Sequence, residues 1–318
     1  MEPKPSNRPI MPGWLPAWQR LAARLSRDRF FYLLLIPFIG WYLIFAYKPM
    51  YGLQIAFKDF SVFKGIAASP WIGFEHFITF FQSPYFVRTL TNTLLISLYS
   101  LIWGFPAPII LALLLNEVKH VFFKKAVQTL TYLPHFISVV VIAGIVTNFL
   151  APSNGLVNIM LAKLGLEKIY FLIVPEYFRT ILVSMNIWKE TGFGAILYIA
   201  ALSGINPELY EAAVIDGANK WKQIWHVTLP GILPTVMIML ILRIGHILDV
   251  GYEAIILLYQ PATYETADVI STYMYRAGIK EGNYDLTTAV GLFNSAVGLV
   301  LVIAANKLSK KFTESGLW

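Results

Sequence analysis

Three polar side chains interrupt the apolar residues 180–202 near their middle: Asn186, Lys189 and Glu190. Residues three and four apart are neighbours on a helix surface, so these side chains share one face. A charged side chain costs about 2.5–3.5 kcal/mol at the centre of a bilayer, and such residues pair with one another or face a water-filled cavity. The pattern therefore indicates either an internal ion pair between Lys189 and Glu190 or a polar path across a membrane.

A second polar group lies in the apolar residues 234–257. Its members are Arg243, His246, Asp249, Tyr252 and Glu253. On the single helix that 234–257 is predicted to form, the four members other than Tyr252 fall within an arc of about 120°. Because a whole stripe of this kind is costly against lipid, we expect it to line a cavity or to contact another subunit. The alternative is an ion-pair network that includes Arg243 and Asp249.

The sequence offers little for enzymatic or metal chemistry. It has no cysteine, which excludes disulfides, cysteine nucleophiles and thiolate metal sites. The five histidines show no HExxH spacing, and there is no Gly-x4-Gly-Lys-Ser/Thr phosphate loop. DxD, HxxxxD and serine-elbow motifs are also absent, which argues against a membrane-embedded transferase. We therefore expect no catalytic residue, metal site or cofactor in this chain, and no ATP hydrolysis by it.

The composition indicates an all-α integral membrane protein. Hydrophobic residues make up 57% and charged residues 14%, with a mean hydropathy of +0.61, against about 45–50% and 25% in soluble domains. A bilayer core of about 30 Å needs roughly 20 mainly apolar residues per helix. Six segments meet this requirement: 30–47, 92–114, 130–150, 180–202, 234–257 and 286–306. No segment alternates with period two, which excludes a membrane barrel.

The basic residues predict the orientation. The net charge is +7, and Lys and Arg flank the apolar segments, which fits a topology signal better than a nucleic-acid surface. The densest basic cluster lies in residues 1–29. We therefore predict a cytoplasmic N-terminal arm (1–29), a transmembrane domain (30–306) and a cytoplasmic tail (307–318), with both termini inside.

The longest predicted cytoplasmic loop, 203–233, has its own pattern. Asn206 before Pro207 favours a helix start, and Gly217 favours a stop in a left-handed conformation. A second short helix is predicted at about 219–227. Two prolines are expected to break the chain before the next span: Pro230 and Pro234. The loop should therefore form a compact pair of helices at the membrane surface.

This loop resembles the sequence signature of the permease subunits of bacterial ATP-binding-cassette importers. The family pattern is Glu-Ala-Ala, three residues, Gly, nine residues and Ile-x-Leu-Pro. The matching residues here, with Val for Ile, are Glu211, Ala212, Ala213, Gly217, Val227, Leu229 and Pro230, and Asp216 and Ala218 flank the glycine as is typical. The resemblance covers about residues 30–312, and 264–276 is similar to the oligosaccharide and polysaccharide branch.

The resemblance implies a type I importer fold with six transmembrane helices in the bacterial inner membrane. In this family an extracytoplasmic binding protein delivers a sugar to two permeases, commonly two different chains. Two cytosolic ATPase subunits bind ATP and Mg, and the Glu-Ala-Ala loop docks on them. The polar groups of 180–202 and 234–257 would then hydrogen-bond the sugar. An importer for a non-sugar solute is the alternative, and a stand-alone transporter is disfavoured because no inverted repeat is present.

Overall fold

The computed structural model describes residues 28–313, so residues 1–27 of the predicted N-terminal arm and residues 314–318 lie outside the described part. Helices dominate the described residues, and the β-pairing among them is an isolated bridge between Lys58 and Trp71. The predicted all-α class is therefore confirmed.

Four continuous helices among these residues are long and apolar enough to cross a membrane. The first helix, Arg29–Phe57, consists of α2 (Arg29–Trp41), η1 (Tyr42–Tyr47), α3 (Lys48–Met50) and η2 (Tyr51–Phe57). The second, Pro84–Glu117, consists of α6 (Pro84–Tyr99), η3 (Ser100–Gly104) and α7 (Pro106–Glu117). The third, Lys220–Gly245, consists of α13 (Lys220–Gln223), η6 (Ile224–Thr228) and α14 (Leu229–Gly245), and the fourth is most of α18 (Tyr284–Thr313). The last helix passes residue 306, where the predicted transmembrane domain ends.

The predicted span 130–150 is not one straight helix. α8 (Val121–Tyr132) and η4 (Leu133–Phe136) meet α9 (Val139–Phe149) at an angle of 105°. Pro134 lacks an N–H group and lies in the tight η4 turn. Ser138 then starts the new helix, since its Oγ accepts from the Val141 N–H. Counted as one broken span, this pair raises the number of candidate spans to five.

Helix α11 (Pro175–Ser203) corresponds to the predicted fourth span. Its 29 residues are long enough to cross a membrane, but they are not apolar enough for α11 to count among the four apolar helices. α11 nevertheless packs at the centre of the fold, against α7, α8 and α14. Its residues Leu182 and Ala195 are fully buried and belong to two different apolar clusters of the core.

The prediction of one helix over 234–257 is wrong. α14 ends at Gly245, and α15 (Tyr252–Leu258) begins after Gly251. The φ of Gly251 is +74°, in the left-handed region that residues with a side chain rarely adopt. The predicted break at Pro230 and Pro234 is also wrong, because the helix from Lys220 runs through both prolines. A wide π turn at η6 precedes Pro230, and such turns accommodate interruptions of the regular hydrogen-bond ladder.

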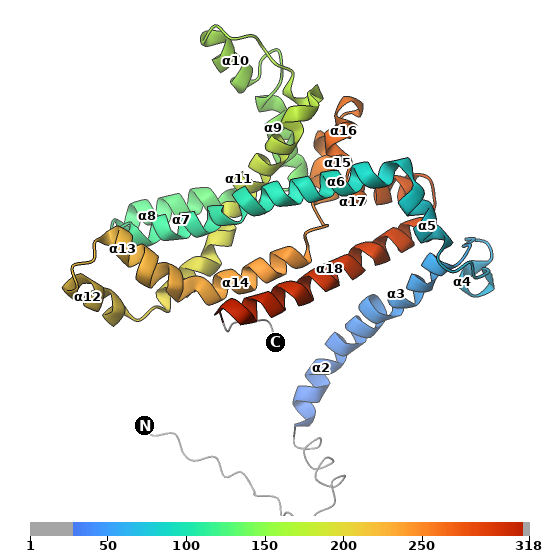
Figure 1. Cartoon of the computed structure of the whole chain (residues 1–318), viewed down its shortest axis with the longest axis horizontal. Coiled ribbons are helices and arrows are strands. Elements are labelled where there is room, and N and C mark those ends of the chain that lie inside the picture. The colour runs from blue at the N-terminus through green and yellow to red at the C-terminus, as the bar shows by residue number, and fades with distance from the viewer. Residues whose placement is uncertain (1–27, 314–318) are drawn as a thin grey trace, which may run out of the picture.

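In Figure 1, α6, α7, α14 and α18 run in one general direction and α2 diverges from them, while connecting elements gather at both ends of this group. α12 (Pro207–Ile215) and α13 lie at one end, whereas α4 (Gly65–Ala68) and α5 (Glu75–Gln82) lie at the other. The remaining short elements are α10 (Leu156–Lys163), η5 (Phe171–Ile173), η7 (Pro261–Thr263), α16 (Tyr264–Ala267), α17 (Ile270–Met274) and η8 (Tyr275–Lys280).

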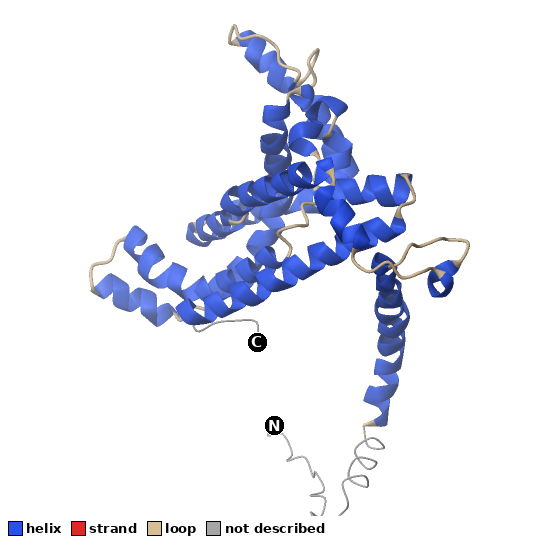
Figure 2. Ribbon diagram, turned by 45° about the vertical axis from the view of Figure 1, so that its right-hand side comes forward, coloured by secondary structure: helices blue, strands red, loops and turns tan. Residues whose placement is uncertain are grey.

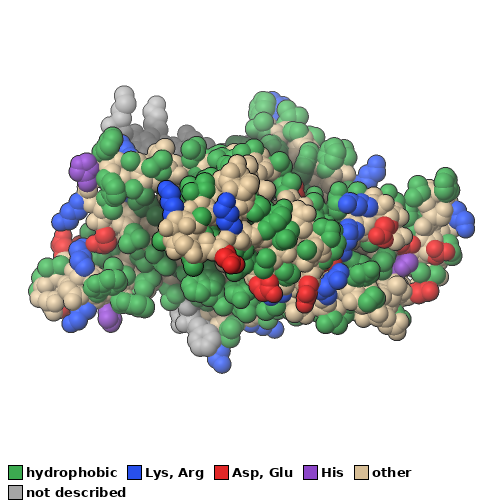
Figure 3. All heavy atoms as spheres, turned by 90° about the horizontal axis from the view of Figure 1, so that it is seen from above, with side chains coloured by type: hydrophobic (Ala, Val, Ile, Leu, Met, Phe, Trp, Pro, Cys, Tyr) green, Lys and Arg blue, Asp and Glu red, His purple; other side chains and the backbone are tan. Residues whose placement is uncertain are grey.

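The surface agrees with a membrane environment. α9 and α10 project from one side of the helices, as a second view shows (Figure 2). Hydrophobic side chains cover much of the face seen in Figure 3. The helix Arg29–Phe57 buries none of its most apolar window inside the chain. A helix that is apolar all round and unburied in its own chain needs lipid or another subunit as its surroundings.

Gly192 allows the closest helix contact of the core. A Cβ atom at this position would collide with the backbone carbonyl of Thr131, so α11 and α8 touch at backbone distance. We predict that Gly192→Ala lowers the thermal midpoint of the purified protein by several degrees, since overpacking costs about 1–3 kcal/mol. Gly144→Ala is the matched control, because its Cβ meets nothing within 4 Å. Equal midpoints for the two variants would contradict this packing.

Candidate functional site

The surface around α12 is built by local capping. The Asn206 side chain accepts from the Glu208 N–H at 3.1 Å and starts the helix. At the other end Gly217 adopts φ +75°, and the Ala218 N–H reaches back to the Ala213 carbonyl at 2.8 Å. This is the left-handed glycine stop that the sequence predicts. Asn219 caps the next helix in the same way.

Most of the predicted coupling residues lie on the exposed side of this surface. Glu211, Ala212, Asp216, Gly217 and Pro230 are exposed, whereas Ala213, Ala218 and Leu229 are partly buried. A hollow of about 610 Å³ opens between α12, α13 and the end of α7, with Glu211 on its wall. Lys220 Nζ bridges this hollow to Glu117 Oε2 at 3.1 Å.

A second cavity, of about 380 Å³, lies between α11 and the segment that follows α14. It is lined by Val139, Asn186, Lys189, Glu190, Asp249, Val250, Gly251, Tyr252, Glu253 and Ala254. Six of the eight residues predicted for a solute path thus meet at one cavity. The other two, Arg243 and His246, are exposed side chains outside its lining. They are separated from the others because the helix stops at Gly245.

The break between α14 and α15 lies near the middle of the long helices, where α6 and α18 contact it. Ser97 on α6 donates through Oγ to the Ile247 carbonyl, which has left the helical ladder. Gly245 lies so close to α18 that a Cβ would be 2.5 Å from Val302 Cγ2. Gly298, near the midpoint of α18, approaches the Gly245 carbonyl. The cavity therefore opens at mid-length of the bundle.

Some of the charged side chains that line the cavity form ion pairs, and others do not. Lys189 forms an ion pair with the Glu190 carboxylate, as one of the two sequence-based alternatives proposes. In the described part of the chain, no ion pair joins Arg243 to Asp249, and none involves Glu253. The Asp249 and Glu253 carboxylates are exposed to the cavity. Carboxylate oxygens there can accept hydrogen bonds from the hydroxyl groups of a solute.

His135 is a neighbour of the cavity that the sequence interpretation missed. Its Nδ1 lies 2.8 Å from Glu190 Oε2, and its ring stacks on Phe193 at 3.9 Å between centroids. A histidine directly after Pro134, inside an apolar segment, was the signal available. Its partner on another helix could be found only from the fold.

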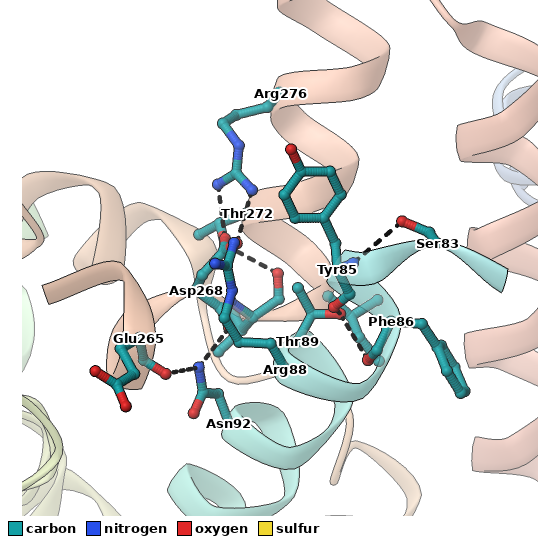
Figure 4. Close-up of polar contacts among 12 residues, drawn as sticks. Ser83, Tyr85, Phe86, Arg88, Thr89, Asn92, Glu265, Asp268, Thr272 and Arg276 are labelled. Atoms are coloured by element: carbon teal, nitrogen blue, oxygen red, sulfur yellow. Dashed lines mark hydrogen bonds and ion pairs between the residues drawn. The ribbon is translucent and has the colours of Figure 1, made fainter. Parts of the chain in front are cut away.

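A buried ion cluster around Asp268 was also missed, because its members come from distant segments (Figure 4). The Asp268 side chain is fully buried and accepts from Arg276 at 2.6 and 2.8 Å and from Arg88 at 2.8 Å. Burial disfavours the Arg276 charge, but the hydrogen bonds and charge of Asp268 outweigh it and raise the pKa of the guanidinium. Asn92 donates to the Asp268 carbonyl and accepts from Arg179. The cluster fastens α6 and α11 to the segment before α18.

Together, the bundle of apolar helices, the polar cavity at its mid-length and the exposed helix pair at one end define a membrane transport protein. Comparisons with known proteins agree. Residues 104–314 match the family described as binding-protein-dependent transport system inner membrane component. The chain belongs to this family and is a multi-pass protein of the inner membrane.

The chain is similar along its whole length to curated relatives from Bacillus subtilis (strain 168). Protein LplB is 44% identical over 99% of both chains. The polygalacturonan/rhamnogalacturonan transport system permease protein YteP is 44% identical over 94% of both. Among solved structures, a chain of a bacterial alginate ABC transporter in complex with an alginate pentasaccharide-bound periplasmic protein is 54% identical. It matches with a TM-score of 0.87 and covers 94% of this chain and 100% of its own, so the two share the type I permease fold.

The Asp268 cluster makes a prediction about stability. Asp268→Asn leaves Arg88 and Arg276 without a counter-charge, and breaking a buried ion pair from one side costs about 3–5 kcal/mol. We expect this variant to lose most of its monodisperse fraction on size-exclusion chromatography after mild heating. Glu265→Gln is the control, because only the Glu265 backbone carbonyl takes part, accepting from Asn92. If both variants behave like the wild type, the cluster does not fasten these segments.

Proposed function

We propose that this chain is a permease subunit of an ATP-driven importer that carries an oligosaccharide across the inner membrane. The names of its relatives support a saccharide cargo, since they specify polygalacturonan/rhamnogalacturonan and alginate. They favour a sugar over the non-sugar solute that the sequence leaves open. The chain itself supplies no catalytic residue and no cofactor site. ATP and Mg are held by partner subunits.

The observation that carries this proposal is the continuity of α11. One wall of the cavity, with Asn186 and Lys189, lies in the middle of this helix. The same helix ends at Ser203, and α12 begins four residues later at Pro207. A push on α12 is therefore delivered to the wall of the cavity through one rigid helix. This is the geometry that an importer driven from the cytoplasm requires.

The docking residues proposed for the ATPase are those of the helix pair: Glu211, Ala212, Ala213, Asp216, Gly217, Ala218, Leu229 and Pro230. The exposed Glu211 and the Gly217 turn support this role. The residues proposed for the sugar path are Asn186, Lys189, Glu190, Asp249, Tyr252 and Glu253. Their shared cavity supports that role. Arg243 and His246 remain proposed path residues outside that cavity.

The proposed assembly contains a second, homologous permease, two ATPase subunits and an extracytoplasmic binding protein, with no nucleic acid. The solved complex of the alginate transporter with its sugar-bound periplasmic protein supports the last of these partners. We further propose six crossings: the four apolar helices, the bent pair at 121–149 and α11. With both termini in the cytoplasm, the arm 1–29, the domain 30–306 and the tail 307–318 keep the predicted limits.

Reconstitution tests the function directly. The complex of this chain with its partner permease, ATPase and binding protein is placed in proteoliposomes and given radiolabelled oligosaccharides. We expect uptake that needs both ATP and the binding protein. Uptake of a non-sugar solute with no uptake of any oligosaccharide would contradict the proposed cargo.

The orientation can be tested with single cysteines, because the chain has none of its own. Phe63 is fully exposed in the loop before α5, and Ile215 is exposed at the end of α12. We predict that an impermeant thiol reagent labels Phe63→Cys in intact cells. It should label Ile215→Cys only after permeabilisation. The reverse pattern would contradict termini inside the cytoplasm.

The coupling role predicts a defect at the turn after α12. Proline cannot adopt positive φ, so Gly217→Pro should distort the turn and lower sugar-stimulated ATP hydrolysis by about tenfold or more in an assembled complex. Glu211→Ala should lower it by removing a charge from the docking surface. Gly204→Ala is the control, because this glycine of the same loop has φ −86°. Full stimulation in both Gly217→Pro and Glu211→Ala would argue against coupling through α12.

A further inference from the structure

The His135 ring is held on two sides by α11. Its plane lies 2° from that of Phe193, with the ring centroids 3.9 Å apart. Its Nδ1 lies 2.8 Å from Glu190 Oε2. Phe193 is three residues beyond Glu190, so the two contacts are adjacent on one helix face. The histidine is therefore fixed in both position and rotation.

The hydrogen bond has a defined direction. Lys189 lies in an ion pair with Glu190, which keeps this carboxylate ionised and able only to accept. His135 Nδ1 must then carry the proton and donate it. The Glu190 carboxylate is consequently held between two donors, the Lys189 ammonium on α11 and the His135 ring on η4. Of these three groups, Lys189 and Glu190 line the cavity.

The contact between His135 and Glu190 also lies at the bend between η4 and α9. The chain turns by 105° directly after His135 and Phe136, and Val139 at the start of α9 lines the cavity. Gly192 brings α11 against the α8 backbone at Thr131, about one helical turn before His135. The bend is thus fastened to the helix that leads into α12. Any movement of α11 must carry Glu190, His135 and the bend together.

From this geometry we propose that His135 is a positioning residue of the import path. It holds the Glu190 carboxylate, with Lys189, at a fixed place on the cavity wall, and it keeps that wall attached to the bend of the broken span. The proposal rests on the proposed import function. It differs from a packing role because the His135 and Glu190 side chains are 28% and 51% exposed, so the surrounding side chains do not enclose their contact, and Glu190 itself lines the cavity.

Two substitutions separate the functions of the ring. His135→Phe keeps a flat ring for Phe193 but removes the donor to Glu190. His135→Asn keeps a donor near the place of Nδ1 but removes the stack. We expect His135→Phe to raise the half-saturating sugar concentration for uptake by about tenfold, the scale of a hydrogen bond to a charged group. His135→Asn should stay within about threefold of the wild type, because its donor restores the position of the carboxylate.

A double-variant cycle with Glu190 tests the partner. If His135 acts through Glu190, then His135→Phe should add no further rise in the half-saturating concentration once Glu190 is changed, so the double variant His135→Phe/Glu190→Gln should match Glu190→Gln alone. Phe136→Leu is the control at the same bend, because the exposed Phe136 ring packs edge-on against His135 and Phe193 but offers no hydrogen-bond donor to Glu190. Its half-saturating concentration should equal that of the wild type.

Uptake is normalised to the amount of assembled complex, and thermal midpoints are measured for all variants. A coupled midpoint for His135 and Glu190 with an unchanged sugar dependence would mean that the contact only supports packing, and would overturn the proposal. Additive effects on the sugar dependence would overturn it as well. A wild-type complex that imports some other solute but no oligosaccharide would defeat the proposed cargo alone. The same cycle, measured with that solute, would still decide the role of His135.

Discussion

Hydrocarbon offers no hydrogen-bond partner to a peptide group, so a chain inside a membrane is helical unless protein or water satisfies its backbone. Within residues 28–313, the chain leaves the helical state near the middle of two predicted spans, at 246–251 and at 137–138. Both breaks lie beside α11. Ser97 supplies a hydroxyl to the carbonyl of Ile247, and Ser138 caps the start of α9. The cavity exists where these broken segments meet α11, and the other features of the chain support that meeting point.

The same constraint accounts for the charges. Lys189 and Glu190 pair with each other at the cavity wall, while Arg88 and Arg276 converge on the buried Asp268 where α6 meets the segment before α18. The Asp268 cluster fastens α6 and α11 far from α12. Glycines at 192 and 298 let helices approach at backbone distance, and Gly245 lets α14 approach the Val302 side chain of α18. Close contacts of this kind leave little room for the helices to shift against one another. A movement of α12 is therefore expected to displace the wall of the cavity as well.

The sequence could predict what depends on local chemistry. Asn206, Pro207 and Gly217 specify α12 by their own capping preferences, and the structure has this helix at Pro207–Ile215. Hydrophobic length located the long helices of the described residues, but it did not predict the bend at 137–138 or the continuation of one helix through Pro230 and Pro234. The end of α14 was also not predicted, because periodicity continues past Gly245, whereas the helix ends there, where Gly245 lies against Val302 and Gly298 of α18. His135 and Asp268 were missed for the same reason, since their partners are 55 and up to 180 residues away in sequence.

In the proposed importer, the cavity beside α11 is a water-filled part of the solute path, and access to it changes with the state of α12. A cysteine at Asn186, in a chain without native cysteines, tests it in the reconstituted complex. We predict that a small thiol reagent labels Asn186→Cys, that transported sugar slows the labelling, and that trapping the ATPase in its ATP-bound state changes the side from which the reagent arrives. Labelling from neither side in either state would contradict the account.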